Sequence, residues 1–163
     1  MKTRLQLFGV SLGRMLLAVA LVAMLAVGSV QPVTAAGPAG QIDIVGPAGS
    51  GRFGTTVTAL PSGNVVVTDP LYDDGATADV GAVYLYDGAT AAQISILTGS
   101  TASDYVGSGG VTVLTNGNYV VGSPYWANGT AADAGAVTWG SSTTGVSGVV
   151  SSANSLVGST AGD

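Results

Sequence analysis

The amino-acid sequence contains no cysteine, no histidine and no glutamate, and charged residues make up only 8% of its 163 positions. Without cysteine the chain forms no disulfide bonds, so the packing of its β-structure must stabilise it. The usual partners of a nucleophilic hydroxyl are also missing, because the abundant Ser and Thr stand in small-residue strings such as GSTAS with only Asp available as a base. We therefore predict that the protein is not an enzyme.

The single long apolar run lies near the N-terminus. Lys2, Arg4 and Arg14 lead into an apolar stretch from Met15 to Val30, and small residues follow up to Ala36. This order predicts a helical signal peptide over residues 1–36. An uncleaved anchor is the alternative, but the stretch is shorter than the roughly 20 residues that span a bilayer. We expect a secreted, extracellular or cell-surface protein with no stable membrane span after cleavage.

Removal of residues 1–36 leaves Arg52 as the only cation beside nine aspartates, a net charge of −8. Such a surface repels phosphate backbones, so we expect no nucleic-acid partner.

An internal repeat organises the remaining chain. Residues 60–72 read LPSGNVVVTDPLY and residues 114–126 read LTNGNYVVGSPYW, 54 positions later. The match continues downstream, and the second copy carries about five extra residues near 141–150. We predict two repeats, at residues 37–104 and 105–163, and call them repeat one and repeat two.

Each repeat is predicted to be a four-stranded antiparallel unit of an all-β fold. Alternating or continuous apolar segments are separated by turn residues such as the PSGN and TNGN strings. Four strands in a period of 50–60 residues are typical of a propeller blade or of a unit in a β-repeat array. Two units make an incomplete propeller or a short array, so the sequence also fits a fragment of a larger repeat protein.

Two resemblances follow from particular strings. Phe53-Gly54, Val66–Pro70 and Gly81–Tyr86 resemble the FG-GAP repeat of integrin-α-like β-propellers. The strings GSGGVTVLTNGNYVVGSPYWANG, AGAVTWG and NSLVGSTAGD are more similar to a repeat of unknown function in large bacterial surface proteins of the haemagglutinin or adhesin kind. Calcium-binding FG-GAP blades carry an Asp-rich loop where this chain has PSGN and TNGN, so the resemblance does not imply calcium.

Four acidic residues form the only candidate metal site. Carboxylate oxygens of Asp69, Asp73, Asp74 and Asp79, which stand within eleven residues, are suitable ligands for Ca²⁺. Repeat two keeps only the last of them, as Asp133, which favours a solvated turn shaped by side-chain hydrogen bonds.

Three aromatic residues are candidates for binding. Tyr72, Tyr125 and Trp126 follow the prolines of the repeated loop, where aromatic rings can stack on a sugar or anchor a protein. The alternative is that they cap the apolar layer between repeats. Trp139 and the Tyr84–Tyr86 segment lie within strands and are predicted to be core.

The favoured function is adhesion or a structural role in a cell-surface assembly. The alternative is a ligand-binding module that recognises a glycan or depends on calcium. Expected partners are an extracellular protein, a glycan, or a second molecule joined through exposed strand edges.

Overall fold

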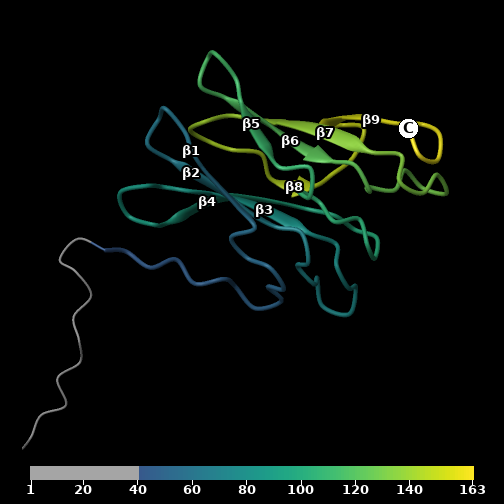
Figure 1. Cartoon of the computed structure of the whole chain (residues 1–163), viewed down its shortest axis with the longest axis horizontal. Coiled ribbons are helices and arrows are strands. Elements are labelled where there is room, and N and C mark those ends of the chain that lie inside the picture. Colours follow the sequence, from purple (N-terminus) through teal and green to yellow (C-terminus); the bar gives the residue numbers. More distant parts are fainter. Residues whose placement is uncertain (1–40) are drawn as a thin grey trace, which may run out of the picture. The chain divides into compact units, whose positions relative to one another are not determined.

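Two β-sheets, one for each repeat, form the fold in the computed structural model, which describes residues 41–163 (Figure 1). The predicted signal peptide lies outside the described residues. No helix occurs between residues 41 and 163, and consequently none there could cross a membrane. The strands are β1 (Thr56–Ala59), β2 (Val65–Asp69), β3 (Ala82–Tyr86), β4 (Gln93–Thr98), β5 (Val111–Val113), β6 (Tyr119–Ser123), β7 (Ala136–Gly140), β8 (Gly148–Val149) and β9 (Ser155–Val157).

Strand order is the same in both repeats. Sheet one runs β1-β2-β3-β4-β8 and sheet two runs β5-β6-β7-β9. The registers also agree, because Val67 pairs with Tyr84 in sheet one and Val121 pairs with Thr138, each 54 residues later, in sheet two. The predicted all-β fold with one sheet for each repeat is confirmed.

The first hairpin turn has the same geometry in both copies. Gly63 has φ 90° and Gly117 has φ 86°, a left-handed conformation that residues with a Cβ seldom adopt. The amide of Leu60 donates to the Asn64 carbonyl at 2.8 Å, and the amide of Leu114 donates to Asn118 at 2.7 Å. The PSGN and TNGN strings therefore close equivalent turns.

The long proline loops are equally alike. Asp79 and Asp133 have φ 56° and 51°, values that Asp tolerates better than most residues with a Cβ. The Gly81 amide donates to the Tyr72 carbonyl at 3.1 Å, and the amide of its counterpart Gly135 donates to the Trp126 carbonyl at 3.0 Å. The residues that the two copies share in these loops thus give both loops the same backbone conformation.

The two sheets share one apolar core. Each sheet has a front face and a back face, defined by equivalent residues. In repeat one the front face carries Val66, Val83, Leu85 and Leu97, and the equivalent residues of repeat two are Val120, Val137, Trp139 and Leu156. The back face of repeat one carries Val67, Ala82, Tyr84 and Tyr86, and the equivalent residues of repeat two are Val121, Ala136, Thr138 and Gly140. The front face of repeat one packs against the back face of repeat two.

A second apolar cluster covers the back face of repeat one. Ile44 and Phe53, from the segment before β1, pack on this face, which the segment follows in Figure 1. The Phe53 ring lies edge-on to Tyr84, with centroids 5.6 Å apart. Sheet one is therefore buried on both faces, as the continuous apolar run in β2 predicts.

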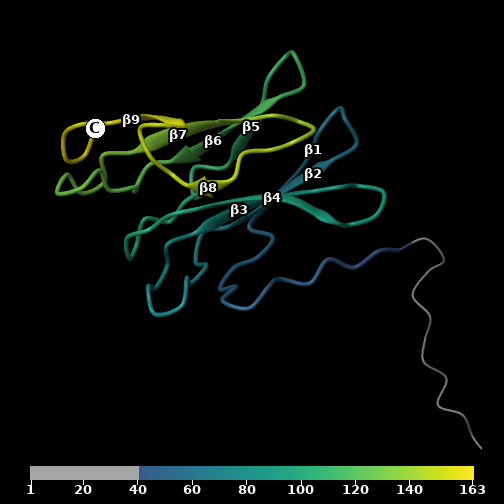
Figure 2. The same ribbon diagram turned by 180° about the vertical axis from the view of Figure 1, so that it is seen from behind.

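The extra residues of repeat two form a strap across repeat one. Residues 141–150, the strap, include β8, which adds to β4 as a parallel strand and so covers one edge of sheet one (Figure 2). The side chains of Ser62 and Asn64 both donate to the Ser142 carbonyl, at 2.9 and 2.8 Å. Val150 joins the shared core.

One core prediction is wrong. Tyr84, Leu85 and Tyr86 are buried, but Trp139, the counterpart of Leu85, is 50% exposed. Its side chain belongs to the front face of repeat two, which no described residue covers as sheet two covers repeat one.

Candidate functional site: a pocket between the proline loops

The three aromatic residues predicted to bind a ligand have different environments. Tyr72 and Trp126 occupy equivalent positions and both turn inward: Tyr72 lies edge-on to Tyr84, and Trp126 belongs to the shared core. Tyr125 faces outward and is 52% exposed. Trp126 therefore lies in the apolar layer between the repeats, as the capping interpretation expects, whereas Tyr72 packs on the back face of repeat one. Of the three rings, Tyr125 is the exposed one.

Tyr125 belongs to a pocket of about 410 Å³ between the two proline loops, the junction pocket. Its ring lies edge-on to Tyr105, with centroids 5.9 Å apart and an interplanar angle of 83°. The lining includes Arg52, Pro70 and Leu71 from repeat one and Tyr105, Ser108 and Tyr125 from repeat two. Both repeats contribute side chains, so the pocket exists only when they are stacked.

Arg52 is the only Lys or Arg in the part of the chain that the structure describes, and its side chain is exposed at the pocket. A buried carboxylate positions its backbone, because the Arg52 amide donates to Oδ1 of Asp69 at 2.7 Å. The pocket therefore combines two tyrosine rings with a guanidinium group. Aromatic faces and a guanidinium are suited to contacts with sugar rings, hydroxyls or carboxylates.

The four candidate calcium ligands have separate roles or lie apart. Asp69 is fully buried at the end of β2, whereas Asp73 and Asp74 are exposed. Oδ1 of Asp73 accepts the Asp79 amide at 2.8 Å, which shapes the loop. Between residues 41 and 163, no three acidic side chains are grouped closely enough to hold a metal ion.

Two buried tyrosines, Tyr84 and Tyr119, have raised pKa values. Burial raises the pKa of Tyr84 well above its ordinary value, and Tyr72 and Asp69 raise it further. Burial also raises the pKa of Tyr119, against the opposing effect of a hydrogen bond with Ser95. Both hydroxyls are therefore neutral at physiological pH and belong to the core rather than to a reactive site.

Comparison with known families gives one match. Residues 59–108 and 113–163 each match a repeat of unknown function, DUF5650, and the two matches begin 54 residues apart. The chain belongs to the DUF5650 family. No curated protein and no solved structure matches it.

Of the residues that line the junction pocket, only Tyr125 was predicted from the sequence to bind a ligand; Arg52, Leu71 and Tyr105 are among those that were not. Arg52 and Leu71 belong to repeat one, and Tyr105 is the first residue of repeat two as we divide the chain. One signal was present, since Arg52 is the single cation after residue 36 in an otherwise acidic sequence. The contact of Tyr105 with Tyr125 carried no such signal, because the two residues are distant along repeat two and only the fold brings their rings together.

Proposed function

We propose that this chain is a non-catalytic extracellular repeat module, used for adhesion or as a structural part of a cell-surface assembly. The supporting observation is what the two repeats keep in common. Gly75 and Gly129, at φ 62° and 63°, and the aspartates Asp79 and Asp133 hold equivalent loop backbones rather than a set of reactive side chains. Shared backbone conformation gives each repeat the same folded surface, as in proteins that present an array of repeats.

Export is part of this proposal. The basic start, the apolar run and the small residues before Gly37 support cleavage of a signal peptide after Ala36. The test is expression of the full chain in a bacterium, followed by N-terminal sequencing of the protein recovered outside the cytoplasm. A sequence starting at Gly37 supports export with cleavage, and retention of Met1 on cytoplasmic protein contradicts it.

The finer fold assignment is a blade of the FG-GAP, integrin-α-like kind. Four-stranded antiparallel sheets stacked face to face support it, since adjacent propeller blades have this construction. An experimental structure of an array with further repeats tests closure: successive sheets turning about a common axis support a propeller, and a straight stack contradicts it.

Adhesion is tested with beads that carry the exported protein. Their retention under flow is measured on surfaces coated with mucin, fibronectin or collagen, with beads carrying an unrelated protein of equal negative charge as the control. Retention above that control supports adhesion. Equal retention on every surface argues instead for a purely structural role.

The junction pocket favours a second candidate function, recognition of a glycan. Tyr125 and Tyr105 offer aromatic surface beside the Arg52 guanidinium in one pocket. A glycan array probed with the protein and with Tyr125→Ala tests this, because the substitution removes an exposed ring without opening the core. Binding that Tyr125→Ala abolishes supports the site, and Val57→Ala, which also alters an exposed residue, is the matched control.

A further inference from the structure

The front face of repeat two has the composition of a buried surface. In repeat one the equivalent residues Val83, Leu85 and Leu97 are almost completely buried by repeat two. Their counterparts Val137, Trp139 and Leu156 are 45%, 50% and 80% exposed. Large apolar residues clustered on an exposed sheet face indicate a surface that another structure covers.

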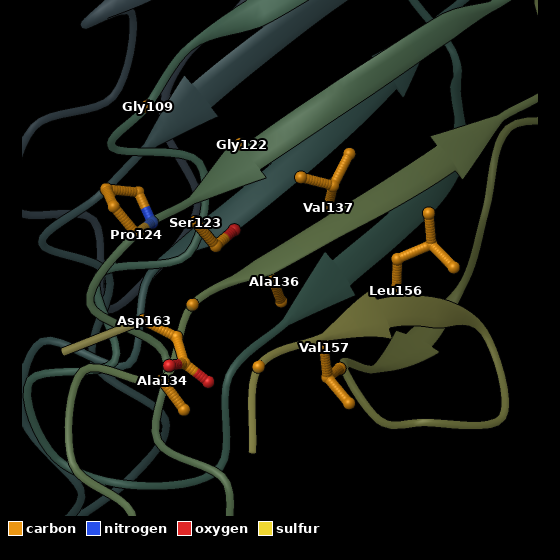
Figure 3. A pocket seen from close by; sticks show the side chains of 12 residues that line it. Gly109, Gly122, Ser123, Pro124, Ala134, Ala136, Val137, Leu156, Val157 and Asp163 are labelled. Carbon is orange, nitrogen blue, oxygen red and sulfur yellow. The ribbon is translucent and has the colours of Figure 1, made fainter. Parts of the chain in front are cut away.

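A groove of about 500 Å³ runs along this face. Its lining includes Gly122, Pro124, Gly135, Val137, Leu156 and Asp163. Figure 3 shows the Val137 and Leu156 side chains projecting from their strands and Asp163 lying near Ala134.

Repeat one shows what fills the equivalent groove. There, residues of the connection to repeat two lie over the front face: Gly107 contacts the Val83 side chain, and Val106 packs closely on Gly81. The Val106 amide donates to the Val80 carbonyl at 3.1 Å. Gly135, the counterpart of Gly81, has no atom within 3.5 Å of the position where its Cβ would stand.

An aspartate marks the junction in both repeats. Oδ2 of Asp104 accepts the amides of Ser100 and Thr101 at 3.0 and 2.8 Å, and Oδ2 of Asp163 accepts those of Ser159 and Thr160 at 2.9 and 2.8 Å; these are equivalent bonds.

Only the first aspartate is also bonded across the junction. Oδ1 of Asp104 accepts the amide of Ala127, from the proline loop of the following repeat, at 3.1 Å. Among the described residues, Oδ1 of Asp163 accepts no amide in this way. Asp163 of repeat two thus makes the local hydrogen bonds of this junction, and Asp104 of repeat one makes both these and the hydrogen bond to the next repeat.

We propose that the front face of repeat two is a docking face for a further DUF5650 repeat joined in series after Asp163. The incoming repeat places a segment like Tyr105–Gly107 in the groove and lays its back face, equivalent to that of repeat two, on Val137, Trp139 and Leu156. Its proline loop donates an amide to Oδ1 of Asp163. This inference rests on the proposed role as a repeat module and identifies the surface through which the array grows.

A second copy of this chain is a poorer occupant. The back face of repeat one is already covered by Ile44 and Phe53, and that of repeat two is covered by repeat one. The front face of repeat one is covered by a back face, and a second copy of this chain has no uncovered back face to offer in the same way.

The test appends residues 105–163 after Asp163, which reproduces the Asp104–Tyr105 connection. The chain has no cysteine, so Val137→Cys, a replacement of similar size, introduces one thiol on the docking face, the reporter thiol. Its reaction with a maleimide is compared in the two-repeat and three-repeat chains. We expect a rate at least about tenfold lower in the three-repeat chain, because a buried thiol is shielded from reagent; a thiol introduced by Val57→Cys, on repeat one, reacts equally in both.

A second substitution keeps the result specific. Trp139→Glu in the first copy of repeat two places a charge on the docking face and restores the reactivity of the reporter thiol in the three-repeat chain, whereas Val57→Glu does not. An equal rate in both chains overturns the proposal, as does an appended repeat that is digested by protease as an unfolded tail. Protection of the reporter thiol in the two-repeat chain that grows with protein concentration overturns it in favour of a second copy.

These outcomes are independent of the adhesion test. A reporter thiol that stays reactive in the three-repeat chain removes the docking face but leaves export and bead retention unchanged.

Discussion

Repeat one and repeat two have the same strand order, the same turn conformations and the same register, yet their faces have different surroundings. Repeat one lies between the segment that carries Ile44 and Phe53 and the whole of repeat two. Among the described residues, no sheet covers the front face of repeat two, where Val137, Trp139 and Leu156 are exposed. The side chains at equivalent back-face positions also differ in size between the two sheets.

Tyr84 and Tyr86 in repeat one correspond to Thr138 and Gly140 in repeat two. Large rings fill the space beneath a single covering segment, where Phe53 packs edge-on against both. A Cβ at Gly140 would collide with the ring of Tyr119, which pairs with Gly140 across β6 and β7 and is itself buried on this face. In sheet one the equivalent pair is Val65 and Tyr86, so the large ring stands on the other strand. The comparison teaches that side-chain size on these faces depends on the neighbouring side chains as well as on the strand pattern.

The largest expected difference between the repeats is at Leu85 and Trp139. Leu85→Ala should lower the free energy of unfolding by about 2–5 kcal/mol, because it leaves a cavity in the shared core. Trp139→Ala should cost at most about 1 kcal/mol, since a half-exposed side chain loses less buried area. Urea unfolding followed by circular dichroism measures both, and equal losses would mean that Trp139 is covered in solution.

Glycines at the start of β3 and β7 sharpen the comparison at the junction. Gly81 and Gly135 have φ 76° and 74°, so alanine at either position carries about 1–2 kcal/mol of backbone strain. Gly81→Ala should cost about 1–3 kcal/mol more, because its Cβ would collide with the backbone of Val106. Thermal unfolding compares the two variants. In the three-repeat chain Gly135→Ala should become as costly as Gly81→Ala, and an unchanged difference would contradict a docked third repeat.

The junction aspartates differ by one hydrogen bond and by burial. Asp104→Ala should cost about 1.5–3 kcal/mol, since it removes a buried carboxylate that accepts three part-buried amide hydrogen bonds. Asp163→Ala removes an exposed carboxylate and should change stability less than the urea titration resolves. A large loss for Asp163→Ala would show that this carboxylate already has a buried partner.

Asp163 also has a pH dependence with a defined sign. Hydrogen bonds from the amides of Thr160 and Ser159 lower the pKa of its carboxyl group. Its small stabilising effect is therefore present above the unfolded pKa and is lost as pH falls through the folded value. NMR titration of the Ser159 and Thr160 amides measures this transition, which Asp163→Ala should abolish.

The smallest expected effects are at two buried tyrosines. Among the described residues the Tyr84 hydroxyl has no hydrogen-bond partner, so Tyr84→Phe should be neutral or slightly stabilising at pH 7. Tyr119→Phe should cost about 1 kcal/mol, because its hydroxyl is hydrogen-bonded with Ser95. Equilibrium unfolding of the two variants side by side tests the difference, and an equal cost would show that Tyr84 has a partner in solution.

Alkaline pH should reveal the same burial. The pKa of each tyrosine is raised by burial, so the stability linked to each hydroxyl is complete below the unfolded value of 10.0 and is lost as pH rises above it. Each Phe variant should therefore lose less stability between pH 9 and about 11 than the unsubstituted chain. Tyrosinate absorbance recorded during unfolding checks this, and identical pH profiles would contradict it.

Much of the fold was predictable because its signals are local. Gly63 and Gly117 mark turns that need positive φ, and the segment around Val66 and Val67 is an apolar β-branched run typical of a strand. The two copies also aligned without gaps through the proline loops. The candidate binding residues were less predictable, since Tyr125 and Trp126 are neighbours in one loop and no periodicity tells which of them points inward.

The error at Trp139 has the same origin. Val83 and Leu85 alternate with their neighbours along β3 as Val137 and Trp139 do along β7, and alternation shows only that two residues share a face. Whether that face is covered depends on a structure distant along the chain, as the packing of repeat two on Leu85 shows.

By itself the sequence determined the two repeats, their strands and the conformation of their turns, because these depend on backbone preferences and on the period of apolar residues. Tertiary structure alone decided that the strap crosses to β4, that Tyr105 and Arg52 meet at the junction pocket, and that the front face of repeat two is open. Burial belongs to pairs of surfaces distant along the chain, so it was settled only when one sheet packed on the other.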